Sequence, residues 1–185
     1  MADKQGAGII PFARHGNSTY YLFHKTFKGR RAGLFVDFGG GSRVGESFEE
    51  TAIREFIEET EAMFFAQDIH NSYAEVNRQK KLIATLIENT QQAHPDWWLK
   101  RLNSKNNTLR NWKTFFIQVD YKKLNAMNKA WKNDRQYRFV KRRELFWLSS
   151  QELLELIDNT PEKLWQRVRQ LQNLRELVLE INASK

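Results

Sequence analysis

The sequence predicts a layered α/β fold, because segments typical of strands alternate with segments typical of helices. Short β-rich apolar runs occur near the N-terminus and again at residues 112–121 and 144–149. Helical spacing of apolar residues occupies residues 48–60 and the last part of the chain. The chain has 185 residues and no internal repeat, so a single domain over residues 1–185 is expected.

The N-terminal part is expected to form three strands. AGIIPF (7–12) and TYYLFHK (19–25) are apolar and β-rich, and a turn at Gly16–Ser18 separates them. The basic segment KTFKGRR (25–31) is expected to be a loop. AGLFVDF (32–38) is predicted to be a third strand that leads directly into Gly39-Gly40-Gly41.

The remaining segments are expected to be mainly helical. Residues 63–111 form a long segment between two predicted elements, and its helical spacing from Ile69 to about Gln92 predicts a helical insertion. SSQE at Ser149–Glu152 has the pattern of a capping box, and Thr160-Pro161 is typical of a helix start. A long C-terminal helix over 160–182 is therefore expected.

The composition excludes several classes of site. The chain has no cysteine, which excludes disulfides, zinc–thiolate sites and cysteine nucleophiles. The sequence shows no signal peptide and no long apolar run, so a cytoplasmic protein is expected. Its formal net charge of +8 favours an anionic partner, although a charged surface that only confers solubility is the simpler explanation of charge alone.

Acidic residues are concentrated in one short stretch of this basic chain. Glu55, Glu58 and Glu59 share one side of the predicted helix 48–60, next to its apolar side. Carboxylates at this spacing repel each other, and a hard divalent cation relieves that repulsion. Oxygen ligands without histidine or cysteine point to Mg²⁺, with Mn²⁺ as the alternative. An amphipathic helix with a solvated acidic face is the simpler alternative for the helix taken alone.

A glycine-rich loop precedes these acids at a fixed distance. The pattern is Gly40, five residues, Glu46, seven residues, Arg54-Glu55-Phe56, one residue, and Glu58-Glu59. The segment Gly40–Ala62 resembles the Nudix box, the signature of the Nudix hydrolase family. It departs from the box at Glu61, where the family usually has glycine. This resemblance implies an α/β/α sandwich with a mixed sheet.

The resemblance also implies roles for particular residues. Glu55, Glu58, Glu59 and the Gly39 carbonyl would bind the metal, and Glu55 is alternatively the base that activates water. Arg54 would orient the carboxylates, and Glu46 would contribute from the loop. Relatives often add a later carboxylate, for which Glu144 is the best candidate and Asp134 a weaker one. By position, Arg43 is expected to contact substrate phosphate, as are Lys28, Arg30 and Arg31, for which a solvated loop is equally good.

The implied activity is Mg²⁺-dependent hydrolysis of the diphosphate linkage in a nucleoside diphosphate derivative, giving a nucleoside monophosphate and a phosphorylated remainder. Two alternatives use the same scaffold: hydrolysis of a pyrophosphate at an RNA 5′ end, and binding of nucleotide or RNA without turnover. The expected partner is a nucleotide or another small diphosphate, with RNA as the alternative, and no membrane. A monomer and a homodimer are both compatible with the sequence. The sequence does not identify the substrate, because loops outside the box select it.

Overall fold

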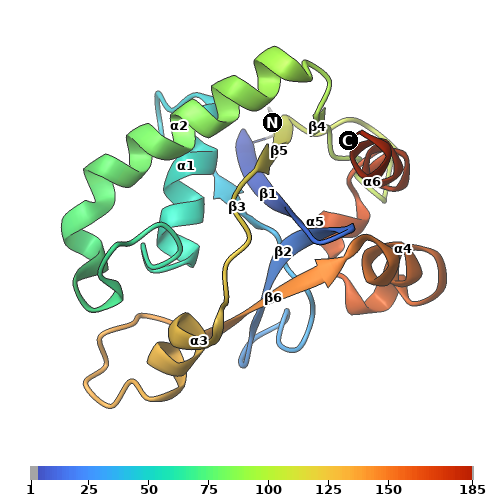
Figure 1. Cartoon of the computed structure of the whole chain (residues 1–185). Coiled ribbons are helices and arrows are strands. Elements are labelled where there is room, and N and C mark those ends of the chain that lie inside the picture. Colours follow the sequence, from blue (N-terminus) through green and yellow to red (C-terminus); the bar gives the residue numbers. More distant parts are fainter. Residues whose placement is uncertain (1–3, 185) are drawn as a thin grey trace.

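A mixed six-stranded sheet lies between two layers of helices in the computed structural model, which describes residues 4–184 (Figure 1). The strand order is β4-β5-β1-β2-β6, and β3 pairs with β1 beside this path. The strands are β1 (Gly6–His15), β2 (Ser18–Thr26), β3 (Phe38–Gly41), β4 (Trp98–Leu99), β5 (Trp112–Gln118) and β6 (Arg143–Ser149).

Strand β1 organises the sheet. It pairs in parallel with β5 along one edge. Its other edge is shared, since Gly6–Ile9 pair antiparallel with β3 and Phe12–His15 pair antiparallel with β2. This division places the glycine run of β3 at the end of the sheet where α1 begins.

Two hydrophobic cores cover the two faces of the sheet. One core packs α1, α2 and α3 on the sheet around Phe38, Phe56 and Phe115, and the other packs α4, α5 and α6 around Phe12, Phe116 and Val168. The predicted α/β/α sandwich is therefore confirmed. The helices are α1 (Phe48–Glu59), α2 (Val76–Ala93), α3 (Asn125–Lys132), α4 (Ser150–Asn159), α5 (Gln166–Arg169) and α6 (Leu174–Ala183), and short 3₁₀ segments cover Ile69–Glu75 and Pro161–Lys163.

The C-terminal segment differs from the sequence-based expectation in one respect. It ends in a helix, as predicted, but 160–182 is not one continuous helix. Asn173 adopts a left-handed conformation (φ +63°) between α5 and α6 and turns the chain. This break lets α5 approach the sheet independently of α6.

Two further elements differ from the prediction. The expected strand 32–38 forms only isolated bridges, at Ala32, Phe35 and Val36, and the regular strand is the glycine segment Phe38–Gly41. The predicted insertion 63–111 is helical only in its first part, because Trp98–Leu99 form strand β4 against β5. In both segments, pairing with a neighbouring strand determines where the regular strand forms. The periodicity of a local segment does not indicate that pairing.

Every helix within residues 4–184 is too short or too polar to cross a bilayer.

The contact between β1 and β3 makes a prediction about stability. A Cβ atom on Gly39 would lie 2.6 Å from the Ala7 carbonyl oxygen and 2.7 Å from Gly8 Cα, both on the backbone of β1. Gly39→Ala is therefore expected to lower the free energy of unfolding by about 3 kcal/mol in urea titration. Gly41→Ala is the control, since a Cβ there meets no atom within 4 Å. Equal stability of the two variants would contradict the proposed close approach.

Candidate active site

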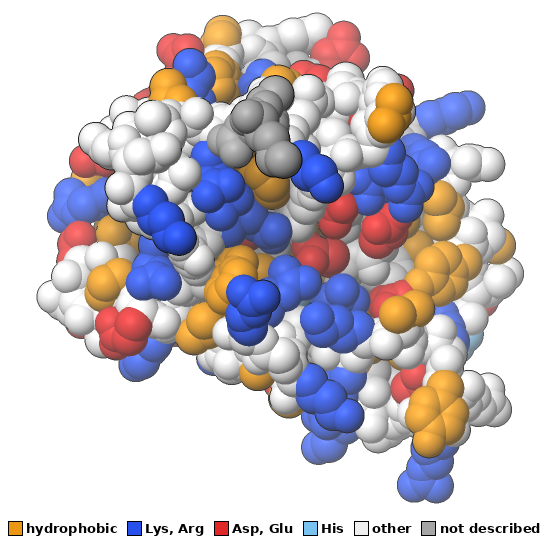
Figure 2. All heavy atoms as spheres, turned by 180° about the vertical axis from the view of Figure 1, so that it is seen from behind, with side chains coloured by type: hydrophobic (Ala, Val, Ile, Leu, Met, Phe, Trp, Pro, Cys, Tyr) orange, Lys and Arg blue, Asp and Glu red, His pale blue; other side chains and the backbone are white. Residues whose placement is uncertain are grey.

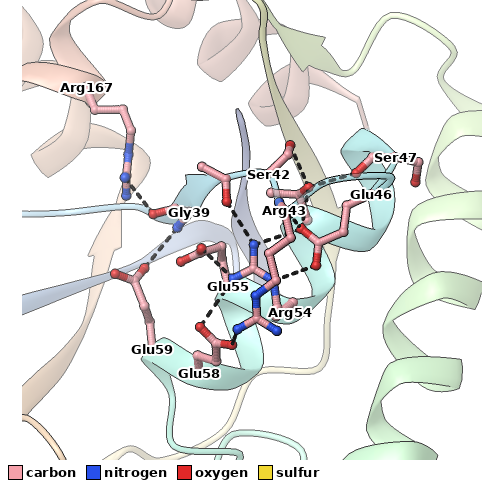
Figure 3. Close-up of polar contacts among 12 residues, drawn as sticks. Gly39, Ser42, Arg43, Glu46, Ser47, Arg54, Glu55, Glu58, Glu59 and Arg167 are labelled. Carbon is pink, nitrogen blue, oxygen red and sulfur yellow. Dashed lines mark hydrogen bonds and ion pairs between the residues drawn. The ribbon is translucent and has the colours of Figure 1, made fainter. Parts of the chain in front are cut away.

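The glycine loop and α1 bring the predicted acids together, as Figure 3 shows. Ser47 begins α1 through a capping box: its side chain accepts from the Glu50 N–H and Glu50 accepts from the Ser47 N–H. The Glu55 carboxylate packs directly on Gly40, where a Cβ would come within 2.4 Å of it. Glycine at this position is therefore a steric requirement of the site.

Arg54 holds three of the acids in place. Its Nε donates to Glu46 Oε1 at 2.7 Å, and its Nη1 donates to Glu55 at 2.7 Å and to Glu58 at 3.3 Å. Its Nη2 donates to Glu46 and to the Gly41 carbonyl, both at 2.9 Å. Hydrogen bonds from Arg54 lower the pKa of Glu46 to about 2. Arg54 thus relieves the repulsion that the sequence concentrates here.

Glu59 has a different environment, since it is 5% exposed. It accepts from the Gly39 N–H at 2.9 Å and from the Arg31 guanidinium at 3.3 Å. Burial raises the pKa of Glu59, although Arg167, Arg31 and Arg143 act in the opposite direction. His24 Nε2 lies 4.0 Å from this carboxylate. Burial also lowers the pKa of His24 far below its usual value, so His24 is neutral and makes no ion pair.

Glu58 faces solvent beside a cleft. Its carboxylate is about half exposed, and the Arg43 guanidinium donates to it at 3.0 Å. The cleft has a volume of about 510 Å³. Four cationic side chains besides Arg54 line it: Arg43, Lys80, Lys141 and Arg143. A cleft with this lining suits an anionic ligand.

Arg167 reaches the site from α5 and was not found by sequence analysis. Its Nη1 donates to the Gly39 carbonyl at 2.6 Å, its Nε to Asp37 Oδ1 at 2.7 Å, and its Nη2 to the Asp37 carbonyl at 2.9 Å. Both side chains are buried. The sequence signal for such a cation was Asp37, which lies in the apolar run before the glycines, because a buried carboxylate needs a cationic partner. Nothing in the sequence identified Arg167 as that partner.

The oxygen atoms expected to bind a metal are of the chemical type that Mg²⁺ prefers, but they are not arranged around a common metal position. Carboxylate and carbonyl oxygens are the donors that Mg²⁺ prefers. Guanidinium groups already contact all of them: Arg54 binds Glu55 and Glu58, Arg31 binds Glu59, and Arg167 binds the Gly39 carbonyl. Within residues 4–184, no group of three or more acidic or histidine side chains is placed to hold an ion. For a metal ion to bind here, some of these oxygen atoms would have to give up a hydrogen bond to a guanidinium group and coordinate the ion instead.

Glu61 now has a physical explanation. Helix α1 ends in a Schellman motif, in which the Ala62 N–H donates to the Ile57 carbonyl at 2.8 Å and the Glu61 N–H to the Glu58 carbonyl at 3.2 Å. Glu61 takes the left-handed conformation (φ +50°) that usually requires glycine. Its buried carboxylate accepts from the Tyr73 hydroxyl and lies 3.6 Å from Arg143 Nη1. These contacts compensate for the backbone strain.

The other candidate residues lie away from the carboxylates of α1. Glu144 neighbours Arg143 on β6, so strand alternation turns it to the opposite face from Glu61, where it pairs with Lys25 in the register of β2. Asp134 accepts from the backbone N–H groups of Arg138 and Phe139 and so organises its own loop. Lys28 and Arg30 are exposed in the turn after β2. Of this basic loop, Arg31 is the member that contacts a box carboxylate.

The strain at Glu61 can be measured by comparing two variants. Glu61→Gly and Glu61→Ala both remove the carboxylate and differ only in tolerance of the left-handed conformation. Glu61→Gly is expected to be more stable than Glu61→Ala by about 1 kcal/mol in urea unfolding. Equal stability would show that the helix end rearranges when the carboxylate is lost.

The buried ion pair makes a second prediction. Arg167→Leu leaves Asp37 buried without its cation and should cost about 3–5 kcal/mol of unfolding free energy. Adding Asp37→Asn should recover much of that loss, because the uncompensated charge is then absent. Arg169→Leu is the matched control, since Arg169 is exposed on the same helix. Independent, additive effects of the two substitutions would contradict a direct charge pair.

No protein-family model matches the chain, and no curated protein sequence matches it. Similar solved structures include an Ap4A hydrolase from C. elegans in a binary complex (11% identity, 97% of this chain, 96% of that chain, TM-score 0.49). They also include RenU, a Nudix hydrolase from M. smegmatis (14% identity, 98% and 90% covered, TM-score 0.47).

NrtR from Shewanella oneidensis is similar at 14% identity over 96% of this chain and 63% of that chain, with a TM-score of 0.47. A structure of its NUDIX domain contains ADP ribose, and a further structure of NrtR contains a 27mer DNA. RenU is named as a Nudix hydrolase, and the NrtR structure with ADP ribose is named as a NUDIX domain. At these identities and TM-scores, assignment of the chain depends on its own residues between Gly40 and Ala62 and on their contacts.

Proposed function

We propose that the chain is a Nudix-type hydrolase that uses Mg²⁺, or alternatively Mn²⁺, to cleave the diphosphate linkage of a nucleoside diphosphate derivative. The observation that carries the proposal is the packing of the Glu55 carboxylate on Gly40, beside Glu58 and Glu59 on one helix. This packing makes the glycine loop and the acids parts of one site rather than separate features. The products would be a nucleoside monophosphate and a phosphorylated remainder.

The reaction consumes one water. The water oxygen bonds to one phosphorus, the bridging P–O bond breaks, and the leaving oxygen keeps the electron pair. A bound divalent cation would supply positive charge to the phosphate oxygens and acidify the attacking water. Glu55, Glu58, Glu59 and the Gly39 carbonyl are the oxygen donors proposed to hold it.

The chain's own groups have separate parts in this proposal. Arg54 orients Glu55 and Glu58 through the hydrogen bonds described above. Alternatively, Glu55 is the general base instead of a metal ligand, because it is fixed against the loop and partly shielded from solvent. Arg43 lies at the mouth of the cleft beside Glu58, where substrate phosphate can take the place of that carboxylate.

The cleft beside Glu58 supports binding of the diphosphate. Lys80 projects into it from α2, and Lys141 and Arg143 enter it from the start of β6. Burial lowers the pKa of Lys141, as do the nearby charges of Arg31 and Arg143. A phosphate would relieve this repulsion among cations, so Lys80 and Lys141 join Arg43 as proposed phosphate contacts.

Binding of a nucleotide without turnover is the second candidate function. It is favoured by Arg167, whose guanidinium contacts the carbonyl oxygen proposed as a metal ligand. A permanent cation at this carbonyl would reduce the affinity for a metal. The two functions differ in whether Mg²⁺ changes the protein and whether the substrate is consumed.

Glutamine variants of α1 separate the two functions. Release of monophosphate from nucleotide sugars, dinucleoside polyphosphates, ADP-ribose and nucleoside triphosphates should require Mg²⁺ or Mn²⁺. Glu58→Gln and Glu59→Gln should each lower kcat/KM by about 100-fold or more. Glu49→Gln is the matched control, because Glu49 is exposed on the first turn of the same helix.

Metal binding provides a second measurement on the same variants. Mg²⁺ should raise the thermal midpoint of the wild-type protein, and Glu58→Gln should reduce that rise. Nucleotide binding by folded wild-type protein with no product from any substrate would establish the second candidate. Unchanged turnover in both glutamine variants would disprove the proposed site.

A further inference from the structure

Apolar side chains line the cleft beside Glu58 together with its cations. They are Ile57, Tyr73, Val76 and Val140. Tyr73 is 49% exposed and Val140 is 96% exposed, so both are open to a ligand. Figure 2 shows a face on which Lys and Arg surround acidic side chains, with hydrophobic side chains between them. A cleft with both kinds of lining suits a ligand that joins phosphate to an apolar or aromatic group.

The Tyr73 ring is held at its hydroxyl. The hydroxyl donates to Glu61 Oε2, and the other carboxylate oxygen, Oε1, lies 3.6 Å from Arg143 Nη1. Glu61 is 2% exposed and lines the cleft, as do its two partners. One buried carboxylate therefore joins Tyr73, in the 3₁₀ segment before α2, to Arg143 at the start of β6. A ring fixed in this way can receive a flat ligand without first being ordered, which reduces the entropy cost of binding.

A separate contact attaches the segment that carries Tyr73. The Ser72 hydroxyl donates to the Glu61 backbone carbonyl at 2.9 Å, and it accepts from the Arg138 guanidinium at 3.2 Å. Neither contact uses the Glu61 side chain. The segment therefore keeps its anchor when the carboxylate is removed, and the carboxylate itself controls only the Tyr73 ring and Arg143.

Folding alone does not account for Glu61. The left-handed conformation at the end of α1 (φ +50°) would be less strained with glycine, which is also the usual residue at this point of the Nudix box. Burial of a carboxylate adds a desolvation cost. The Tyr73 hydroxyl needs no protein partner, because a half-exposed side chain can form a hydrogen bond to water. Strain and a buried charge at one residue that lines a cleft indicate a role in the cleft.

We propose that Glu61 is a substrate-positioning residue and that the ring it holds, Tyr73, is the surface on which the base of the nucleotide stacks. This inference rests on the proposed function, in which the diphosphate contacts Arg43 and Lys141. A planar base is the favoured group, because a half-exposed aromatic ring offers a stacking face, whereas an aliphatic chain needs an enclosed apolar pocket. Glu61 touches neither the base nor the phosphates. It acts by fixing the Tyr73 ring and by keeping Arg143 in the wall of the cleft.

The first test compares two ligands that cannot be hydrolysed between their phosphorus atoms: α,β-methylene-ADP, which has a base, and methylenediphosphonate, which lacks one. Calorimetric titration in Mg²⁺ should show at least about tenfold tighter binding of α,β-methylene-ADP to the wild-type protein. Tyr73→Leu should remove most of this preference. Tyr137→Leu is the matched control, because Tyr137 is 92% exposed and does not line the cleft.

Variants of Glu61 separate positioning from stability. Glu61→Gly relieves the strain at the helix end but releases Tyr73, so it should bind α,β-methylene-ADP about fivefold more weakly than the wild-type protein does. Glu61→Gln keeps an acceptor for the Tyr73 hydroxyl and should recover most of that affinity. Stability should rank the variants differently, since Glu61→Gly is expected to unfold at a higher urea concentration than Glu61→Ala. Tyr73→Phe keeps the ring without its hydroxyl, and its effect should not add to that of Glu61→Gly.

The outcomes separate this inference from the proposed hydrolase function. Equal affinity for the two ligands, an equal loss with Tyr137→Leu, or wild-type affinity in Glu61→Gly would overturn the inference, whatever the protein hydrolyses. Absence of product from every substrate would overturn the hydrolase function. The binding measurements do not need turnover, so a base preference that depends on Tyr73 and Glu61 would then support the same positioning role in a nucleotide-binding protein.

Discussion

Four glutamates lie close together in this protein, and guanidinium groups make that arrangement tolerable. Glu46, Glu55 and Glu58 share Arg54, and Glu59 is held by Arg31 and the Gly39 N–H. Removing these donors would leave like charges packed against each other, which folding does not reward. These contacts come from three segments: the glycine loop supplies the Gly39 N–H, α1 supplies Arg54, and the turn after β2 supplies Arg31. The local fold therefore depends on neutralising the acids.

The same neutralisation defines how the site can work. In the proposed function, a metal or a substrate phosphate would replace contacts that Arg43 and Arg54 already make with the carboxylates. Such an exchange would couple the two ligands, because a phosphate that attracts Arg43 would leave Glu58 accessible to a metal. The buried Arg167–Asp37 pair differs, because breaking it would leave an uncompensated charge in the core. It fixes the loop rather than taking part in the exchange.

Much of the site was predictable because it is local in the chain. The helix at 48–60, the capping box at Ser149 and the contact of Arg54 with the acids each involve residues within about two turns or one loop. Glu61 was identified as unusual from sequence, and the structure supplied the reason, a left-handed residue in a Schellman motif. By contrast, Glu144 was a candidate because the resemblance implies a later carboxylate, and strand alternation turns it away from Glu61.

By itself, the sequence determined the layered α/β fold, the carboxylate-bearing helix, and the glycine loop on which Glu55 packs, because each is set by short-range spacing and by steric limits at glycine. Only the tertiary structure decided which distant groups reach that site. Arg167, 128 positions after Gly39, arrives because Asn173 breaks the C-terminal helix and frees α5 to approach the sheet. Likewise, the Glu61 carboxylate meets Tyr73 and Arg143 in the wall of the cleft, although Arg143 lies on β6. Contacts between residues so far apart follow from strand pairing and core packing, which the periodicity of a single segment does not encode.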